Sequence, residues 1–362
     1  VGNSSHPLFF DYNGDGLMDL LIGSNGDVLE GGNRSNSLVL FENTGTKTRP
    51  EFTFITDNYL NVKALNQIYT KLAPTLGDFD GDGDIDIIIG HSQGFMLYAE
   101  NLAGKNNPPI FSALKNEWSD IFAGQNASPT VIDFDGDGLL DLVVGKLNNN
   151  LNFYKNRGKV NEPIFMGFNP DATNLGKLFI GNNFDKQHGS PEFFQIKDEL
   201  YLLMGFSNGH VSLYHVPERN KDASFTLFKD NILPEHLGRQ VNPAIIDIDS
   251  DGYFEIFIGN ERGGINVYKS DIGTSDLLSS NEEESEEQGF LLYPNPAKNL
   301  LSLTGSSKGV FFIYDIDGRM LKKQIKAEYM IDIDVSELKN GMYILKMVDE
   351  QQIISKKFLI SK

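Results

Sequence analysis

An acidic nine-residue segment recurs four times in this sequence, and each copy runs directly into a short apolar stretch that ends in glycine. The copies are loop 1 (residues 11–19), loop 2 (78–86), loop 3 (133–141) and loop 4 (247–255). Oxygen-bearing side chains occupy positions 1, 3, 5 and 9, and glycine occupies position 6. Calcium is a hard cation that takes six to eight oxygen ligands. The pattern therefore predicts four calcium-binding loops.

The predicted side-chain ligands differ slightly between the loops. They are Asp11, Asn13, Asp15 and Asp19 in loop 1; Asp78, Asp80, Asp82 and Asp86 in loop 2; Asp133, Asp135, Asp137 and Asp141 in loop 3; and Asp247, Asp249, Asp251 and Glu255 in loop 4. Loop 1 has a neutral amide at position 3, and loop 4 has serine at position 4 and glutamate at position 9. We expect about four structural calcium ions, with loops 2 and 3 binding most tightly.

Two other interpretations of the loops are weaker. Asp, Asn and Gly favour turns in general, but four copies in register, each before a strand and a glycine, favour a metal site. An EF-hand needs a bidentate glutamate at position 12 and flanking helices. Position 12 is instead Ile22, Ile89, Val144 or Ile258, each inside an apolar strand.

The loops belong to longer repeats. Each has a proline shortly before the loop (Pro7, Pro74, Pro129, Pro243), apolar strands on both sides of it, and a third strand ending in an aromatic residue at 38–41, 95–98, 151–154 or 265–268. The first three copies continue through Asn and Gly to a Pro-x-Phe segment at 50–52, 109–111 or 163–165, where we expect a fourth strand. Four short strands per repeat predict β-propeller blades, packed on both faces.

A fifth, degenerate copy spans residues 190–205, with its third strand at 211–214. It keeps the proline, both strands and the final glycine, but its loop is two residues shorter and lacks the ligands. We expect a tight turn there and no calcium.

The repeats resemble FG-GAP or VCBS-type repeats of calcium-binding propellers, and the resemblance covers residues 1–271. It implies that the backbone carbonyl at loop position 7 also binds calcium, here that of Leu17, Asp84, Leu139 or Tyr253. Seven blades are usual in that family, so the five visible repeats indicate an unusually small ring or one truncated from about seven. The start at Val1-Gly2-Asn3, almost directly before the first repeat, suggests a fragment or a mature form.

The C-terminal part has a different sequence pattern, without the acidic loops of the repeats. Residues 272–289 are rich in Ser and Glu and indicate a solvated linker. Residues 290–362 contain short strands that predict a small Ig-like β-sandwich. The whole chain is therefore expected to be all-β.

This last block closely resembles the C-terminal sorting domain of the type IX secretion system of Bacteroidetes-like bacteria. The matching features are Tyr-Pro-Asn-Pro at 293–296, Asp-Gly-Arg at 317–319, the Leu…Asn-Gly-x-Tyr segment at 338–343 and the basic end at 356–362. The resemblance implies passage through the periplasm, recognition by the outer-membrane translocon, and release or anchoring at the cell surface.

Composition excludes several other roles. The net charge of −19 argues against nucleic acid as a partner, because phosphate binding needs a basic surface. The absence of cysteine excludes thiol catalysis and disulfides. No apolar run approaches the roughly 20 residues of a transmembrane helix.

The segment Gly90-His91-Ser92-Gln93-Gly94 matches the nucleophile elbow of hydrolases, but an elbow needs a helix after the serine, whereas an apolar strand follows here. The same turn recurs in the other repeats, so periodicity explains it without catalysis. We expect a secreted or surface-displayed, non-catalytic module that binds an extracellular glycan or protein. The alternative is a polysaccharide lyase or hydrolase built on a calcium-stabilised propeller, and the sequence reveals no catalytic residue for it.

Overall fold

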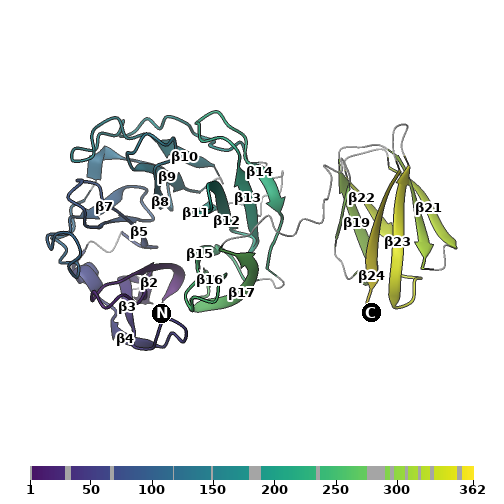
Figure 1. Cartoon of the computed structure of the whole chain (residues 1–362), viewed down its shortest axis with the longest axis horizontal. Helices are drawn as coiled ribbons and strands as arrows, with labels where there is room; N and C mark the ends of the chain where they lie inside the picture. Colours follow the sequence, from purple (N-terminus) through teal and green to yellow (C-terminus); the bar gives the residue numbers. More distant parts are fainter. Residues whose placement is uncertain are drawn as a thin grey trace. The chain divides into compact units, whose positions relative to one another are not determined.

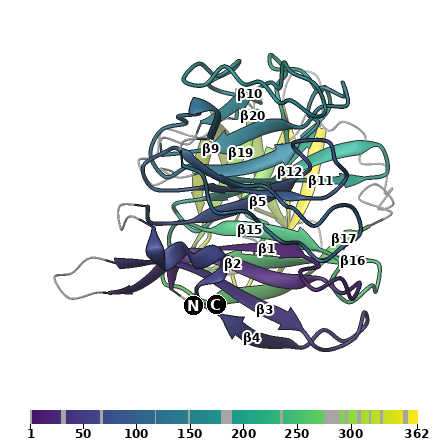
Figure 2. The same cartoon turned by 90° about the vertical axis from the view of Figure 1, so that its left-hand side faces the viewer.

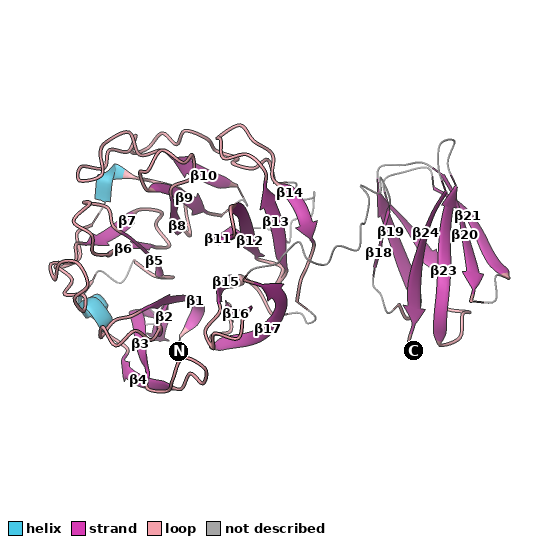
Figure 3. Ribbon diagram, in the orientation of Figure 1, coloured by secondary structure: helices cyan, strands magenta, loops and turns pink. Residues whose placement is uncertain are grey.

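Antiparallel β-sheet makes up nearly all the regular structure, as Figure 3 shows. The computed structural model describes residues 2–28, 34–65, 69–116, 118–147, 150–178, 189–233, 237–274, 290–293, 297–305, 309–316, 319–326, 330–348 and 353–362. The described helices are two short 3-10 helices, η1 (Tyr59–Ala64) and η2 (Trp118–Asp120). The chain is thus all-β, as predicted.

Two compact units divide the chain, Val1–Ser279 and Ser280–Lys362. The predicted division into residues 1–271, 272–289 and 290–362 stays a prediction, because 275–289 lie outside the described residues. So do 294–296 of the predicted Tyr-Pro-Asn-Pro motif and 317–318 of the Asp-Gly-Arg turn.

Five sheets form the first unit, and in each of them strands that follow one another in sequence are neighbours. Sheet 1 contains β1 (Asn3–Phe10), β2 (Asp19–Val28), β3 (Arg34–Asn43) and β4 (Phe52–Thr56); sheet 2 contains β5 (Ala73–Gly77), β6 (Asp86–Gly90) and β7 (Met96–Ala99); sheet 3 contains β8 (Ser128–Ile132), β9 (Asp141–Gly145) and β10 (Leu151–Tyr154); sheet 4 contains β11 (Gly189–Ile196), β12 (Glu199–Phe206), β13 (Val211–Val216) and β14 (Thr226–Lys229); sheet 5 contains β15 (Asn242–Ile246), β16 (Tyr253–Gly259) and β17 (Ile265–Gly273). Figure 1 shows the first strand of each sheet facing a common centre.

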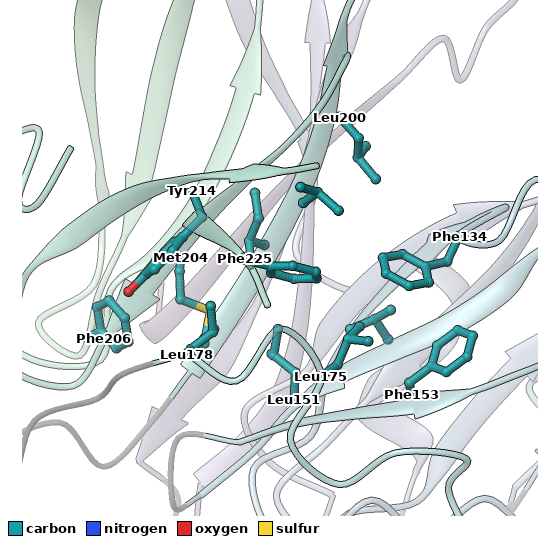
Figure 4. Packing of buried hydrophobic residues seen from close by; sticks show 13 residues of the cluster. Phe134, Leu151, Phe153, Leu175, Leu178, Leu200, Met204, Phe206, Tyr214 and Phe225 are labelled. Carbon is teal, nitrogen blue, oxygen red and sulfur yellow. The ribbon is translucent and has the colours of Figure 1, made fainter. Parts of the chain in front are cut away.

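Hydrophobic clusters fill the space between successive sheets. On β6, Ile87 and Ile89 belong to the cluster shared with sheet 1, whereas Ile88 belongs to the cluster shared with sheet 3. Figure 4 shows the cluster between sheets 3 and 4, with Phe134 and Met204 among its members. Because successive residues of a strand point to opposite faces, a strand buried on both faces is apolar throughout. This explains the unbroken apolar runs of the repeats.

A repeated backbone contact also joins neighbouring sheets. The glycine at the end of each second strand has no space for a side chain, because a Cβ there would overlap a carbonyl oxygen of the next sheet. The pairs are Gly23 with Leu72, Gly90 with Ala127, Gly145 with Gly189, Gly205 with Val241, and Gly259 with Ser5. Each carbonyl residue lies two positions before the repeat proline.

The last of these contacts joins sheet 5 to sheet 1. The Ser5 backbone N–H donates to the carbonyl oxygen of Asn260 at 3.2 Å, and the Ser5 hydroxyl donates to that of Gly264 at 2.8 Å. The rings of Phe9 and Phe257 meet with centroids 4.6 Å apart. The side view in Figure 2 shows β1 next to β15.

The predicted fourth strand of repeats two and three is wrong. Within the described residues, sheets 2 and 3 end at the third strand and continue as isolated bridges, such as Asn101 with Phe111. Pro108 and Pro109 lack the N–H group that a strand pairs with. The side chain of Asn101 accepts the Ile110 N–H at 2.9 Å, but Asn43 accepts the Glu51 N–H in the same way just before β4, so this contact does not by itself end the sheet.

The degenerate repeat forms sheet 4. Its β11 and β12 are joined by Lys197 and Asp198 alone, with Ile196 paired to Glu199. The predicted tight turn is therefore confirmed. Sheet 4 also gains the strand β14, which the sequence pattern had not revealed.

The second unit contains two antiparallel sheets. One has the order β18 (Phe290–Tyr293), β19 (Leu300–Gly305), β22 (Met330–Asp334); the other has the order β21 (Met320–Lys326), β20 (Gly309–Asp315), β23 (Gly341–Val348), β24 (Ile353–Ile360). Leu301 and Ile333 from the first sheet share one hydrophobic cluster with Phe311, Leu345 and Phe358 from the second. Two sheets around one core agree with the predicted sandwich arrangement.

Candidate metal centres

Each acidic loop connects the first two strands of sheet 1, 2, 3 or 5, and its position-1 aspartate folds it. In loop 3, the two carboxylate oxygens of Asp133 accept the backbone N–H groups of Gly136 at 2.9 Å and Gly138 at 3.0 Å. Asp11, Asp78 and Asp247 likewise accept backbone N–H groups with both oxygens. These hydrogen bonds alone fold the loop around the position-1 carboxylate.

Positive φ angles make the curl possible. The position-6 glycines Gly16, Gly83, Gly138 and Gly252 have φ of 81°, 92°, 86° and 90°. Residues with a Cβ rarely adopt this conformation, which confirms the predicted requirement for glycine. Position 4 also has a positive φ, and in loop 4 it is Ser250, with φ of 55°.

Acidic side chains within loops 2, 3 and 4 bring their carboxylate oxygens close together. Carboxylate oxygens of Asp78, Asp80 and Asp82 lie within 4.8 Å of one another. The same holds for Asp133, Asp135 and Asp141, and for Asp247, Asp249 and Asp251. In loop 1, the Asn13 amide donates to Asp15 at 3.1 Å, which brings positions 3 and 5 together.

The position-7 residues follow the converging carboxylates. The N–H groups of Leu17, Asp84, Leu139 and Tyr253 each donate to the aspartate at position 5, over 2.8 to 3.0 Å. Their carbonyl groups, which the family resemblance implicates, stay predicted ligands.

The position-9 carboxylate is deeply buried in all four loops. Asp19, Asp86 and Asp141 are 0% exposed, and Glu255 is 3% exposed. Asp141 accepts the N–H groups of Phe134 at 3.1 Å and of Asn156 at 2.8 Å, so it ties the loop to the third strand. Burial raises the pKa of Asp86 to about 6 and that of Asp141 to about 7.

Three buried carboxylate oxygens have no hydrogen-bond partner in the described structure: Asp84 Oδ1, Asp135 Oδ1 and Glu255 Oε1. A buried anionic oxygen without a partner is destabilising, and a bound cation would satisfy it. The donors are all oxygens, the ligand type of calcium and magnesium, and the loops offer several per site. The loops therefore fit calcium. The sequence predicts only the backbone carbonyl of Asp84 as a ligand. Its side-chain carboxylate is a further candidate ligand.

Four charged side chains beside the loops were missed by the sequence analysis. They are Glu42, Glu100, Lys155 and Lys269, each directly after the aromatic end or last apolar residue of a third strand. The signal that could have revealed them is their fixed place in the repeat, since the first three precede the repeated asparagine.

The Gly90–Gly94 segment forms a turn and is followed by β7, a strand. The Ser92 hydroxyl accepts hydrogen bonds from the backbone and side chain of Thr70, at 3.2 and 3.0 Å. The serine therefore stabilises a loop contact, in agreement with the non-catalytic interpretation of this motif.

Two parts of the chain match known families. Residues 11–89, which include loops 1 and 2, match the FG-GAP-like repeat, and residues 291–361 match the secretion system C-terminal sorting domain. The chain carries an FG-GAP-like repeat and a type IX sorting domain. The sorting domain confirms that this is a secreted or outer-membrane surface protein of Bacteroidetes that interacts with the type IX machinery. The calcium-binding VCBS type stays a prediction.

Solved structures resemble the chain only distantly. PorZ, an essential surface component of the type IX secretion system of Porphyromonas gingivalis, matches with 11% identity and a TM-score of 0.32 over 98% of this chain, which spans 59% of that chain. A GH43 glycoside hydrolase engineered for endo-xylanase and exo-arabinofuranosidase activity matches with 9% identity and a TM-score of 0.42, covering 99% of this chain and 92% of that one. No curated protein matches by sequence. Among the described residues, no helix has the length and apolar character needed to cross a membrane.

Proposed function

We propose that the first unit is a closed, five-bladed β-propeller. The support is that the glycine-to-carbonyl contact between sheets 5 and 1 repeats the contact of the other four junctions. Moreover, β1 contacts both β5 and β15. A five-membered ring replaces the expectation of about seven blades.

The four acidic loops hold structural calcium in this proposal. Like charges packed within one turn repel, and a divalent cation at their centre turns that repulsion into cross-linking. The buried oxygens of Asp84 and Asp135 that have no hydrogen-bond partner favour such an ion. Side chains at positions 1, 3, 5 and 9 and the carbonyl at position 7 would hold it. The ion would then fasten the first two strands of a blade to each other.

The rigid ring serves as a non-catalytic binding module for an extracellular glycan or protein, delivered by the sorting domain. The observation that carries the binding role is an aromatic cluster of the half-buried Phe95 with the exposed Phe122 and Phe168. Phe122 and Phe168 are 37% and 60% exposed, and their ring centroids lie 5.9 Å apart. Exposed apolar groups that cluster mark ligand or partner sites. Within the described residues, the rings of Phe122 and Phe168 are exposed to solvent.

The test is retention of the full chain on a panel of immobilised polysaccharides, with and without calcium, while new reducing or unsaturated ends are measured. We expect calcium-dependent retention without product. Retention should be weaker for Phe168→Ala than for the control Phe228→Ala, which removes a ring that is 50% exposed and lies outside the cluster. Product formation would contradict the non-catalytic role and support a lyase or hydrolase. Retention unchanged by Phe168→Ala would exclude the aromatic cluster.

A further inference from the structure

One position beside the acidic loops changes its charge from blade to blade. It is Glu42 at loop 1, Glu100 at loop 2, Lys155 at loop 3 and Lys269 at loop 4. On sheet 5, Lys269 pairs in register with the position-9 residue Glu255. On sheets 1 to 3, the residue after this position donates its N–H to the position-9 aspartate. The four side chains therefore start from the same place on the third strand.

The two lysines reach into their loops. The Lys155 ammonium contacts Asp135 and lies 2.8 Å from Asp137, the residues at positions 3 and 5. The Lys269 ammonium lies 3.0 Å from Asp249 and 2.9 Å from Asp251, the same two positions. Each lysine thus places a positive charge between carboxylates that would bind a cation. Lys155 is the more enclosed, with its side chain 31% exposed against 67% for Lys269.

The two glutamates have the opposite effect. Glu42 accepts hydrogen bonds from Asn13 at 3.3 Å and Tyr12 at 3.2 Å, both residues of loop 1. Glu100 lies near enough to Asp80 of loop 2 to repel it, although its carboxylate also forms an exposed ion pair with Lys115 at 3.4 Å. Each glutamate adds a negative charge where loops 3 and 4 have a positive one.

The charge balance of the loops therefore differs. With this position included, loop 2 has six carboxylates and no lysine, and loop 1 has four carboxylates and no lysine. Loops 3 and 4 have four carboxylates and one lysine each. Unpartnered oxygens do not separate the loops, because Asp84 Oδ1 in loop 2 and Asp135 Oδ1 in loop 3 both lack a hydrogen-bond partner, so the ranking depends on the charge balance. A divalent ion is attracted most strongly where negative charge is uncompensated.

We propose that loops 1 and 2 are the calcium-requiring loops, whereas Lys155 and Lys269 are built-in counter-cations that hold loops 3 and 4 without metal and weaken calcium binding there. This inference rests on the proposed calcium binding and ranks the loops within it. It places loop 3, expected from its ligands alone to bind tightly, among the weak sites. Two of the four acidic loops would then stay folded when calcium is scarce.

Calorimetric titration of the full chain with calcium chloride tests the ranking. We expect about two tight ions in the wild type. Lys155→Met keeps the aliphatic stem but removes the charge, and should raise the calcium affinity of loop 3 at least about tenfold. Lys269→Met should act likewise on loop 4, and Glu100→Lys should remove one tight ion. Lys159→Met, which changes an exposed lysine outside loop 3, is the matched control.

Thermal unfolding gives a second readout, in which the effect of Lys155→Met on the melting temperature depends on calcium. In chelator, Lys155→Met should melt below the wild type because its carboxylates lose their counter-charge, whereas in excess calcium this deficit should disappear. Four equally tight ions in the wild type, unchanged by the lysine substitutions, would overturn the ranking and leave the proposed calcium binding intact. Absence of calcium binding in the wild type and in every variant would overturn both.

Discussion

Ser250 occupies a backbone conformation that suits glycine. Its φ is 55°, and the equivalent residues of loops 1 to 3 are Gly14, Gly81 and Gly136, with φ between 72° and 77°. A side chain in this left-handed region costs about 1–2 kcal/mol. Loop 4 therefore folds with local strain that its sister loops lack.

Substituting Ser250 with glycine should stabilise the protein by about 0.5–1 kcal/mol, because the relief of strain exceeds the extra freedom that glycine has in the unfolded chain. The mirror change is Gly136→Ser, where no atom lies within 4 Å of a Cβ. It should destabilise loop 3 through the backbone alone. Urea unfolding at constant calcium measures both. Equal stability of the two variants and the wild type would show that position 4 is unstrained.

His91 gives the protein a pH dependence. It is fully buried after β6, its Nδ1 accepts the Gln93 N–H at 3.2 Å, and burial lowers its pKa to about 4. Between pH 4 and 6.5 the unfolded chain binds a proton at this residue that the folded protein excludes. The contribution of His91 to stability should therefore fall as the pH falls through this range, by up to roughly 3 kcal/mol, whereas protonation of Asp86 and Asp141, whose pKa values are raised, acts in the opposite direction.

The variant His91→Asn retains an acceptor near the Nδ1 position and cannot be protonated there. The difference in unfolding free energy between this variant and the wild type, measured by urea denaturation at several pH values, should shift in favour of the variant as the pH falls from 6.5 to 4, because the carboxylates contribute equally to both proteins. Parallel curves for the two proteins would contradict the assignment.

At the level of elements, repetition determined what the sequence could predict. The second strands and their final glycines were expected in the right places, because four copies agree with one another. The glycine at loop position 6 followed from turn chemistry. In contrast, β14 corresponds to β4 of sheet 1 but lacks the Pro-x-Phe signal that precedes β4, and the fourth strands expected in repeats two and three are reduced to isolated bridges in the described residues.

The repeated asparagine shows what single-residue reasoning misses. Asn156 Oδ1 accepts the N–H groups of Gly158 at 3.0 Å and Ile164 at 3.1 Å, and Asn43 and Asn101 act in the same way. The sequence shows that these asparagines are repeated, but it does not show their hydrogen-bond partners, which lie up to nine residues away. Lys155 and Lys269 were missed for a related reason, since their contacts depend on the register between two strands.

At the scale of the whole first unit, ring closure depends on contacts that no single repeat contains. Gly259 belongs to the last repeat and Ser5 to the first, 254 positions apart in the sequence. The sequence contained the signal, a glycine and a proline in all five copies, but one repeat does not show that this glycine packs against the residue two positions before the next proline. The proposed closure rests on the same contact occurring a fifth time, between Gly259 and Ser5.

Gly259→Ala tests closure directly. If sheet 5 packs on sheet 1, the added methyl group overlaps the carbonyl oxygen of Ser5 and the backbones must move apart, which should destabilise the unit by about 1–3 kcal/mol. Gly145→Ala makes the equivalent overlap with Gly189 at the interior junction of sheets 3 and 4, and so calibrates the effect. Scanning calorimetry should show similar decreases in melting temperature for the two variants. A destabilised Gly145→Ala beside an unchanged Gly259→Ala would mean that the ring is open in solution.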